Sequence, residues 1–350
     1  MNFREVGNTG VLVSEIGFGC GGNAGLMIRG LPQQQREVIQ RALELGINYF
    51  DQAPDYGDGL SETNLGRALK DLGAHPYITT KVEVRADNLG DIAGHIVDSM
   101  DQSLDRLGMD HVDFLQLHNG PVMERPELSG RGYAHLWVED YLRPGGALEG
   151  LQLVQRSGKA RFIGFITRGN DYSAAQRLVD TGAFSLINAS VNLLNPSAAL
   201  KPGGMHVDQD YGGILSYANS QGAGAAIYSP LAGGFLNDNA VAGGLPHPMA
   251  GRTRSIETRA AGEARATGLR RAKSLSFLSR KLNPDSQTED HDLAEAAIRF
   301  VLSLEGVTTV LGGFSDQEQV EQIAACSGRG PLSEENMARL EMVWRANFGL

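Results

Sequence analysis

Residues 33–51, QQQREVIQRALELGINYFD, combine a helical pattern, a glycine and a short apolar run in one stretch of chain. The apolar positions before the glycine recur at spacings of three and four residues, which places them on one face of an amphipathic helix. Gly46 ends this pattern, and glycine is favoured just past a helix because it adopts a left-handed conformation without a Cβ clash. The stretch therefore predicts a helix over about Gln33–Leu45, followed by a buried strand at Ile47–Phe50.

The same order of helix, glycine and apolar run recurs six more times along the chain. One further apolar run precedes the first helix, so the sequence predicts eight strands: Ile16–Cys20, Ile47–Phe50, Tyr77–Thr80, Val112–Leu117, Arg161–Ile166, Ser185–Val191, Ala225–Tyr228 and Val307–Leu311. Short strands that alternate with helices are typical of parallel strands joined by right-handed crossovers. Eight such units favour an α/β fold that closes into a (β/α)8 TIM barrel. A doubly wound open sheet is the alternative, because the number of strands alone does not exclude it.

Four segments lie outside these repeated units. Residues 1–14 predict a β-hairpin around Gly7–Gly10 that caps the N-terminal mouth of the barrel. Long loops are expected at 119–146 after the fourth strand and at 231–259 after the seventh, and an extra helical stretch at Ala272–Asn283. Because no linker or low-complexity segment interrupts the chain, residues 1–350 are predicted to form a single domain.

The composition excludes several classes of partner. The net charge is -10 with no block of like charge, which argues against nucleic acid and acidic membrane surfaces. Cys20 and Cys326 are the only cysteines, which favours a reduced compartment over a disulfide framework. No apolar run approaches the roughly 20 residues of a membrane span, and the N-terminus lacks a signal-peptide pattern. A cytoplasmic protein with no membrane partner is predicted.

Four side chains with acid–base chemistry lie at or just beyond three successive strands. Asp51 ends the second strand, Tyr56 follows five residues later, Lys81 ends the third strand and His118 ends the fourth. In a β/α barrel the active site lies at the C-terminal ends of the strands, so these residues are expected at one mouth. Taken singly, each has an ordinary structural explanation, such as a helix N-cap for Asp51 or a packed ring for Tyr56.

This combination suits the reduction of a carbonyl group. A hydride that arrives at carbon leaves negative charge on the carbonyl oxygen, which must then receive a proton. The pKa of an ordinary tyrosine lies near 10, and we expect Lys81 to lower that of Tyr56 while Asp51 holds Lys81 in place. His118 is expected to donate a hydrogen bond to the same oxygen and to orient it.

Three segments carry a resemblance to a known family. The segments that resemble the signature and catalytic motifs of the aldo-keto reductases are NYFDQAPDYGDGLSETNLGRAL (Asn48–Leu69), ITTKV (Ile78–Val82) and DFLQLH (Asp113–His118). The resemblance extends from the N-terminal hairpin to about Gln322. It implies a (β/α)8 fold, a nicotinamide cofactor bound without a Rossmann motif, and catalytic roles for Asp51, Tyr56, Lys81 and His118.

The resemblance also implies positions for the cofactor and the substrate. The ring of Tyr228 is expected to stack on the nicotinamide, and the loop after it to lie over the pyrophosphate. The implied cofactor-binding residues are Thr167, Asn188, Tyr228, Ser229, Leu231, Gly233, Gly312, Ser315, Glu318 and Gln322. Asn119 and Trp137 are expected to line the substrate pocket, and no metal ligand set is predicted.

Some of these positions depart from the family pattern. The family usually has Ser-Asn after the fifth strand, where this chain has Ile166-Thr167. It usually has Gln after the sixth, where Asn188 stands, and often a basic residue near the 2′-phosphate of NADP, where Glu318 stands. A carboxylate disfavours that phosphate but can accept hydrogen bonds from a ribose diol, so the sequence leans toward NAD. Arg252 and Arg254 could reverse this preference by closing over the phosphate.

The sequence thus predicts an NAD(P)-dependent oxidoreductase that interconverts an aldehyde, ketone or sugar hemiacetal with the alcohol or lactone. The segment GLSE (Gly59–Glu62) is similar to family members that act on aldoses. One alternative is a low-turnover, nicotinamide-binding redox-sensor subunit. Another is a barrel lyase that uses Lys81 as a Schiff base. The substrate, the direction of the reaction and the oligomeric state remain open.

Overall fold

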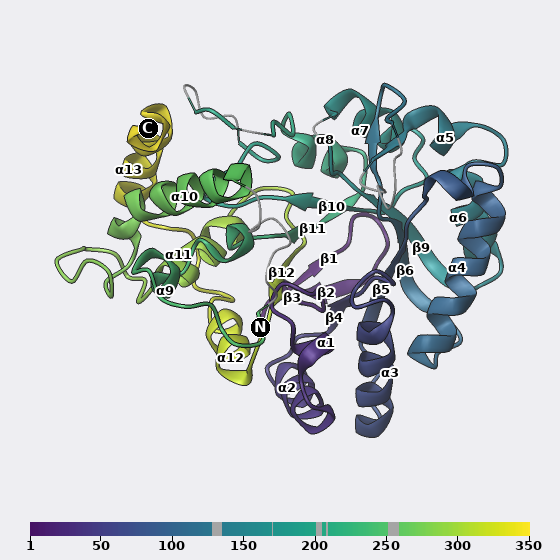
Figure 1. Ribbon diagram of the computed structural model, residues 1–350, viewed down its shortest axis with the longest axis horizontal. Coiled ribbons are helices and arrows are strands. Elements are labelled where there is room, and N and C mark those ends of the chain that lie inside the picture. The colour runs from purple at the N-terminus through teal and green to yellow at the C-terminus, as the bar shows by residue number, and fades with distance from the viewer. Residues whose placement is uncertain (128–134, 170, 201–204, 208, 251–258) are drawn as a thin grey trace.

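Eight parallel strands close into a barrel with helices on its outside in the computed structural model of this protein (Figure 1). The structure describes residues 1–127, 135–169, 171–200, 205–207, 209–250 and 259–350. Around the barrel the strands are β3 (Ile16–Gly19), β4 (Tyr49–Asp51), β5 (Tyr77–Val82), β6 (Val112–Leu117), β9 (Ala160–Ile166), β10 (Leu186–Ser190), β11 (Gly224–Tyr228) and β12 (Thr309–Gly313).

Closure of the barrel excludes the open-sheet alternative. β12 pairs in parallel with β3, with Val310 opposite Ile16 and Gly313 opposite Gly19. The last strand therefore hydrogen-bonds to the first, whereas an open sheet would leave both as edges. The predicted (β/α)8 fold is confirmed.

A helix follows each barrel strand and covers its outer face, as the right-handed crossover rule requires. In chain order these helices are α2 (Pro32–Glu44), α3 (Leu60–Leu72), α4 (Ile92–Leu107), α6 (Ala147–Arg156), α7 (Tyr172–Val179), α8 (Ile214–Ser220), α11 (Leu293–Leu302) and α12 (Gln317–Ala324). The chain also forms α1 (Leu26–Arg29), α5 (Val138–Leu142), α9 (Asp238–Val241), α10 (Arg259–Ser274) and α13 (Glu334–Arg345). Within the described residues, no helix is both long and apolar enough to cross a membrane.

The predicted hairpin is present and caps the inside of the barrel. Strands β1 (Phe3–Glu5) and β2 (Leu12–Ser14) pair antiparallel. Val6 and Val11 between them belong to the same buried cluster as Tyr49 and Phe114. Gly7 allows this close approach, because its φ is +48° and a Cβ there would lie 2.2 Å from the carbonyl oxygen of Gly222. The hairpin thus fills one end of the barrel with apolar side chains and leaves the other end for a site.

Several boundaries differ from those predicted. The helical stretch expected at Ala272–Asn283 was wrong: α10 ends at Ser274, and a short 3-10 turn, η4, covers Ser276–Leu278. β5 runs two residues further than expected, so Lys81 lies inside a strand, and β12 likewise extends to Gly313.

The connections after the strands also hold more structure than expected. The segment at 119–146 contains a parallel pair, β7 (Gly120–Val122) and β8 (His135–Trp137), as well as α5. The segment at 231–259 contains a 3-10 turn, η2 (Ala232–Gly234), and α9. A third long connection, at 191–213 between β10 and α8, was not predicted, because it lacks a distinctive pattern of its own.

Candidate active site

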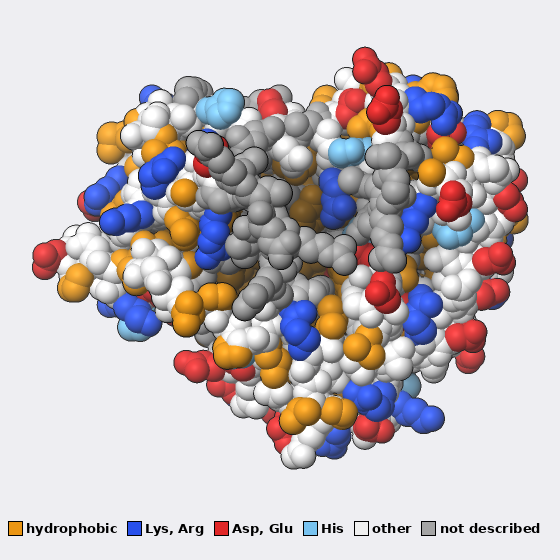
Figure 2. All heavy atoms as spheres, in the orientation of Figure 1, with side chains coloured by type: hydrophobic (Ala, Val, Ile, Leu, Met, Phe, Trp, Pro, Cys, Tyr) orange, Lys and Arg blue, Asp and Glu red, His pale blue; other side chains and the backbone are white. Residues whose placement is uncertain are grey.

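The four predicted catalytic residues come from three neighbouring strands and meet at one mouth of the barrel. In the parallel register Asp51 lies opposite Thr79, two residues before Lys81, and Lys81 lies opposite Gln116, two residues before His118. Asp51, Lys81 and His118 are almost fully buried, and Tyr56, in the loop before α3, is half-buried. Figure 2 shows that the face in view is hollowed at its centre, where hydrophobic and basic side chains line the depression.

Lys81 and Asp51 form a buried ion pair. The Lys81 Nζ atom donates to Asp51 Oδ1 over 2.5 Å and to the carbonyl oxygen of Gln52 over 2.7 Å. The second carboxylate oxygen of Asp51 accepts from Asn188 Nδ2 over 3.1 Å, and Asn188 Oδ1 accepts from Gln116 Nε2 over 2.8 Å. Burying two charges is costly unless their remaining hydrogen bonds are satisfied, and this network satisfies them. An amine held in this way is a poor Schiff-base nucleophile, so the lyase alternative gains no support from the structure.

Tyr56 lies between this ion pair and His118. The Lys81 Nζ atom is 5.3 Å from the centre of the Tyr56 ring, a cation–π distance. The Tyr56 and His118 rings are 6.0 Å apart with an interplanar angle of 80°. A carbonyl oxygen placed between Tyr56 and His118 would therefore face a phenol on one side and an imidazole on the other.

The pKa of Tyr56 moves in the opposite direction to our expectation. Burial raises it well above the ordinary value, and the carboxylates of Asp51 and Asp55 raise it further. The prediction that the Tyr56 pKa is lowered was wrong: burial and the two carboxylates outweigh the charge of Lys81, which Asp51 lies against. Tyr56 is therefore a protonated phenol at neutral pH, which suits a proton donor.

His118 faces a carboxylate that the sequence analysis did not single out. Its Nδ1 atom lies 3.3 Å from Asp55 Oδ1. Burial lowers the pKa of His118, whereas the hydrogen bond and charge of Asp55 act in the opposite direction. The ring is therefore neutral at pH 7, with Asp55 positioned to fix its orientation. The only sequence signal was that Asp55 immediately precedes Tyr56.

Tyr228 ends β11 at the same mouth, and its hydroxyl lies beside two polar side chains from other parts of the barrel. The guanidinium of Arg168 and the hydroxyl of Tyr211 both interact with it. Tyr211 donates a hydrogen bond to Gln209 Oε1 over 2.5 Å. The half-buried Tyr228 ring therefore has polar neighbours at its hydroxyl end. Arg168 and Tyr211 were not identified from the sequence, because one follows β9 and the other lies in the long connection after β10.

Thr167 and Asn188, two of the predicted cofactor-binding residues, are both hydrogen-bonded within the protein. Thr167 Oγ1 donates to the carbonyl oxygen of Asn188 over 3.2 Å, and both ends of the Asn188 side-chain amide take part in the Asp51 network. Thr167 retains a hydroxyl oxygen that can accept a hydrogen bond. Of the two, Thr167 is the better placed to meet a carboxamide.

The turn after β11 presents an open backbone at this mouth. Ser229 has a φ of +55°, and its carbonyl oxygen accepts from Asn192 Nδ2 over 3.1 Å. Leu231 precedes η2, and Gly233 is exposed, with a φ of +67° and no atom within 4 Å of the place that a Cβ would take. Backbone amides in such a turn can bind an anion. This agrees with the expected placement of a pyrophosphate.

The predicted cofactor-binding residues from Gly312 to Gln322 lie around the start of α12, and two of their side chains are hydrogen-bonded within the protein. Ser315 Oγ donates to the carbonyl oxygen of Ala24 over 2.8 Å, and Gln322 Nε2 donates to Asp292. Gly312 lies buried in β12, where a Cβ would come within 2.4 Å of the Phe314 ring. Glu318 is exposed in the first turn of α12, whose N-cap is Asp316. The amides of this first turn remain the feature suited to an anion.

The two predicted substrate-pocket residues are placed differently. Both atoms of the Asn119 side-chain amide bond the backbone of Val84, and Asn119 is fully buried. Trp137 Nε1 donates to the carbonyl oxygen of Met123 over 3.0 Å, and the guanidinium carbon of Arg125 lies 4.3 Å from its ring centre. These contacts are structural, and the assignment of Asn119 and Trp137 to the pocket remains a prediction without support from them.

Comparison with known proteins decides the family. The model of the Aldo/keto reductase family matches residues 15–345. The chain belongs to the aldo-keto reductase family. L-galactose dehydrogenase of Arabidopsis thaliana is 26% identical over 98% of this chain and 94% of its own length. L-glyceraldehyde 3-phosphate reductase of Escherichia coli O157:H7 is 26% identical over 97% and 92%.

Two further relatives of this aldo-keto reductase are informative. A putative voltage-gated potassium channel subunit beta of Schizosaccharomyces pombe is 27% identical over 97% of this chain and 92% of its own length. The holo form of an aldo-keto reductase from Bacillus halodurans superposes with a TM-score of 0.69 at 22% identity, over 99% and 97% of the two chains. The fold is therefore that of the family along nearly the whole chain.

Family membership makes this aldo-keto reductase an NAD(P)-dependent oxidoreductase, and its site fits a nicotinamide cofactor in part. The half-buried Tyr228 ring, the open turn at Gly233 and the first-turn amides of α12 suit a nicotinamide, a pyrophosphate and an adenosine phosphate. Asn188, Ser315 and Gln322 are committed to contacts within the protein. The barrel mouth therefore provides the elements of a cofactor site, with fewer free side-chain contacts than expected.

One group of side chains has the composition of a cation site. Ligand atoms of Asp55, Glu83 and His118 all lie within 4.8 Å of one another. Arg85 pairs with Glu83, and the charges of Lys81 and Arg168 act on His118. These three cationic side chains disfavour a divalent ion at this place. Glu83 instead pairs with Arg85, and Asp55 faces the imidazole of His118.

The directions of these pKa shifts predict how the rate depends on pH. The pKa of Tyr56 is raised above 10 and that of His118 is lowered, so neither group titrates between about pH 6.5 and 9. Reduction, which needs the phenol, should be flat across this range. Oxidation, which needs the phenolate, should rise by up to about tenfold per pH unit. Initial rates in both directions with one substrate pair test this, and a fall in the reduction rate centred near pH 8 would contradict it.

Proposed function

We propose that this aldo-keto reductase interconverts an aldehyde, ketone or sugar hemiacetal with the corresponding alcohol or lactone, with Tyr56 as the proton donor and acceptor. The observation that carries the proposal is the buried Lys81–Asp51 pair, at 2.5 Å, placed beside the Tyr56 ring and across from His118. An acid, an amine, a phenol and an imidazole at one barrel mouth suit proton transfer to a carbonyl oxygen.

In this mechanism Tyr56, Lys81, His118 and Asp51 have separate roles. A bound nicotinamide cofactor supplies or accepts the hydride. The Tyr56 phenol gives its proton to the oxygen on which negative charge develops, and the ammonium of Lys81 stabilises the phenolate that remains. The neutral imidazole of His118, oriented by Asp55, holds the same oxygen in place. Asp51 keeps Lys81 within reach of Tyr56 throughout.

A sugar-type substrate is the class that we favour. Two relatives across the length of the chain bear the names L-galactose dehydrogenase and L-glyceraldehyde 3-phosphate reductase. The segment Gly59–Glu62 resembles family members that act on aldoses. A screen of NADH and NADPH oxidation with aldehydes and ketones, and of NAD and NADP reduction with aldoses, tests the proposal. It fails if the protein binds the cofactor but turns over no member of the panel.

A low-turnover redox sensor is the second candidate, supported by the relative named as a channel subunit beta. Such a subunit keeps the barrel and the cofactor while the chemical step or the release of the cofactor is slow. A turnover rate far below the roughly 1 s⁻¹ at the lower end of ordinary enzymes, with tight cofactor binding, would favour it over the enzyme. Steady-state rates and cofactor release measured on the same preparation separate the two.

We further propose that the protein prefers NAD(H), because Glu318 lies exposed in the first turn of α12 where a 2′-phosphate is expected. Arg252 and Arg254, the two side chains expected to oppose this preference, lie outside the described residues. Glu318→Arg should shift the preference toward NADP(H), since it removes a repulsive contact and adds a bidentate phosphate partner. For a solvated, screened site the change should be on the order of 1–3 kcal/mol, or about five- to 150-fold in selectivity.

Dissociation constants of both cofactors, measured by fluorescence quenching, test this preference. Glu321→Arg is not a suitable control, because Glu321 pairs with Arg41. Glu305, on the turn after α11 and away from α12, provides a matched control for the charge change. An NADP/NAD ratio that stays the same in Glu318→Arg would show that Glu318 lies outside the cofactor site.

A further inference from the structure

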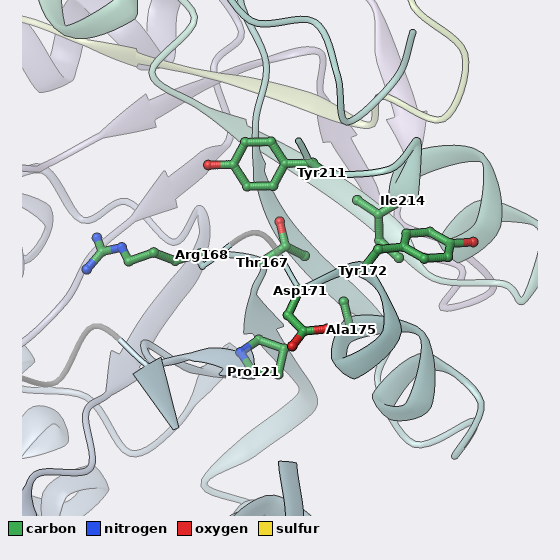
Figure 3. A pocket seen from close by; sticks show the side chains of 8 residues that line it. All are labelled: Pro121, Thr167, Arg168, Asp171, Tyr172, Ala175, Tyr211 and Ile214. Carbon is green, nitrogen blue, oxygen red and sulfur yellow. The ribbon is translucent and has the colours of Figure 1, made fainter. Parts of the chain in front are cut away.

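Arg168 occupies a place in the barrel mouth that the proposed reaction does not explain. It directly follows Thr167 at the C-terminal end of β9, the same end at which Lys81 and His118 lie, and it is half-buried. Figure 3 shows that its guanidinium and the Tyr211 hydroxyl point to the same side, away from Tyr172. Arg168 and Tyr211 also line one small pocket together with Thr167.

The guanidinium of Arg168 lies beside the hydroxyl of Tyr228. Tyr228 also neighbours Tyr211, whose hydroxyl donates to Gln209 over 2.5 Å. A guanidinium has five N–H donors in a fixed fork, so an interaction with one phenol leaves donors for a ligand. Tyr228 thus neighbours Arg168 without neutralising its charge.

The charge of Arg168 reaches the catalytic residues. This charge opposes the rise that burial causes in the pKa of Tyr56, and it adds to the lowering that burial causes in the pKa of His118. Burial and the charge of Arg168 also lower the pKa of His135, the first residue of β8. Among the ion pairs of the described residues, none includes Arg168. A partly desolvated guanidinium with no carboxylate partner favours an anion brought by a ligand.

We propose that Arg168 binds an anionic group of the substrate, a carboxylate or a phosphate, while the carbonyl group lies between Tyr56 and His118. The substrate class is then an aldehyde, ketone or hemiacetal that carries a negative charge a few atoms from the reacting carbon. A guanidinium recognises the two oxygens of a carboxylate or phosphate in one plane, which sets the orientation of the substrate as well as its affinity. This inference rests on the proposed function.

The experiment compares matched pairs of substrates that differ only in the anion. Succinic semialdehyde against butanal tests a carboxylate, and glyceraldehyde 3-phosphate against glyceraldehyde tests a phosphate. The ratio of kcat/KM for the charged member to that for the neutral member is measured for the wild type, Arg168→Met and Arg168→Lys. Arg161→Met is the matched control: it removes one positive charge from β9, but at the opposite end of the strand, where Arg161 pairs with Asp113.

The wild type should prefer the charged member of at least one pair by about tenfold or more, and the pair that shows the preference identifies the anion. Arg168→Met should reduce this ratio by about 10- to 100-fold, mainly through KM, and Arg168→Lys by less. Arg161→Met should retain the wild-type ratio. Equal kcat/KM for the charged and neutral members in the wild type would overturn the proposal even if Arg168→Met failed to fold.

The cofactor is the other source of anionic groups in the site, and its affinity provides the second measurement. Dissociation constants for NADH and NADPH in Arg168→Met should stay within about threefold of the wild type. A loss of cofactor affinity as large as the loss of substrate selectivity would show that Arg168 serves the cofactor, and the proposal would be wrong. Absence of turnover with every carbonyl compound, charged or neutral, would instead refute the proposed function itself.

Discussion

Tyr56→Phe is expected to lower turnover by roughly 10² or more and to leave cofactor affinity nearly unchanged. The substitution removes one hydroxyl from a ring that stays packed beside Lys81, at 5.3 Å, and His118. Because burial and two carboxylates hold the Tyr56 pKa high, the group that is lost is a protonated phenol, the form that reduction requires. Single-turnover rates with saturating cofactor measure the chemical step directly.

A matched control comes from the surface of the barrel. Tyr217 lies on α8 and its hydroxyl bonds Asp180 on the outside of the fold. Tyr217→Phe removes the same atom and should retain the wild-type rate. If Tyr56→Phe keeps most of its activity, another group delivers the proton and Tyr56 has been misassigned.

The second large effect is expected from the Asp51–Lys81 pair. Asp51→Asn and Lys81→Met should each abolish most of the activity, and each should destabilise the fold by about 3–5 kcal/mol, because each leaves one uncompensated buried charge. The double variant should lose far less than the sum of the two. The reason is the 2.5 Å contact in a site where both side chains are almost fully buried.

A double-mutant cycle on kcat/KM and on the free energy of unfolding measures this coupling. The Arg161–Asp113 pair, at 2.9 Å and more exposed, is the matched control, and its coupling should fall below about 1 kcal/mol. Strict additivity for Asp51 and Lys81 would mean that the two residues do not act through one another, and the mechanism proposed above would have to be revised.

The meeting of the four candidate catalytic residues at one mouth could be predicted from the sequence because of the way in which a β/α barrel is built. Helix periodicity and the glycines past the helices locate the strands, and every parallel strand ends at the same mouth. Asp51 ends β4, Lys81 lies one residue before the end of β5 and His118 directly follows β6, so their places along the strands bring them together. The helical stretch at Ala272–Asn283 was misplaced because a connection between barrel elements is not bound by this repeat.

Residues whose partners lie far away in the sequence could not be predicted in this way. Arg168 and Tyr211 come from two separate connections of the barrel and meet at Tyr228, the last residue of β11, and no local pattern predicts such contacts. Asn119 illustrates the converse case: its position after β6 suggested a pocket residue, but its amide bonds the backbone of Val84.

By itself, the sequence determined that Asp51, Lys81 and His118 stand at the mouth of the barrel, since local periodicity and chain order place the strand ends. Only the tertiary structure decided the state of those side chains. Burial and the carboxylates of Asp51 and Asp55 raise the Tyr56 pKa, which the sequence alone had predicted to be lowered. Asp55 faces His118, and Arg168 is held in the mouth without a carboxylate partner among the described ion pairs. Charge states depend on desolvation and on distances between atoms, which exist only once the chain has folded.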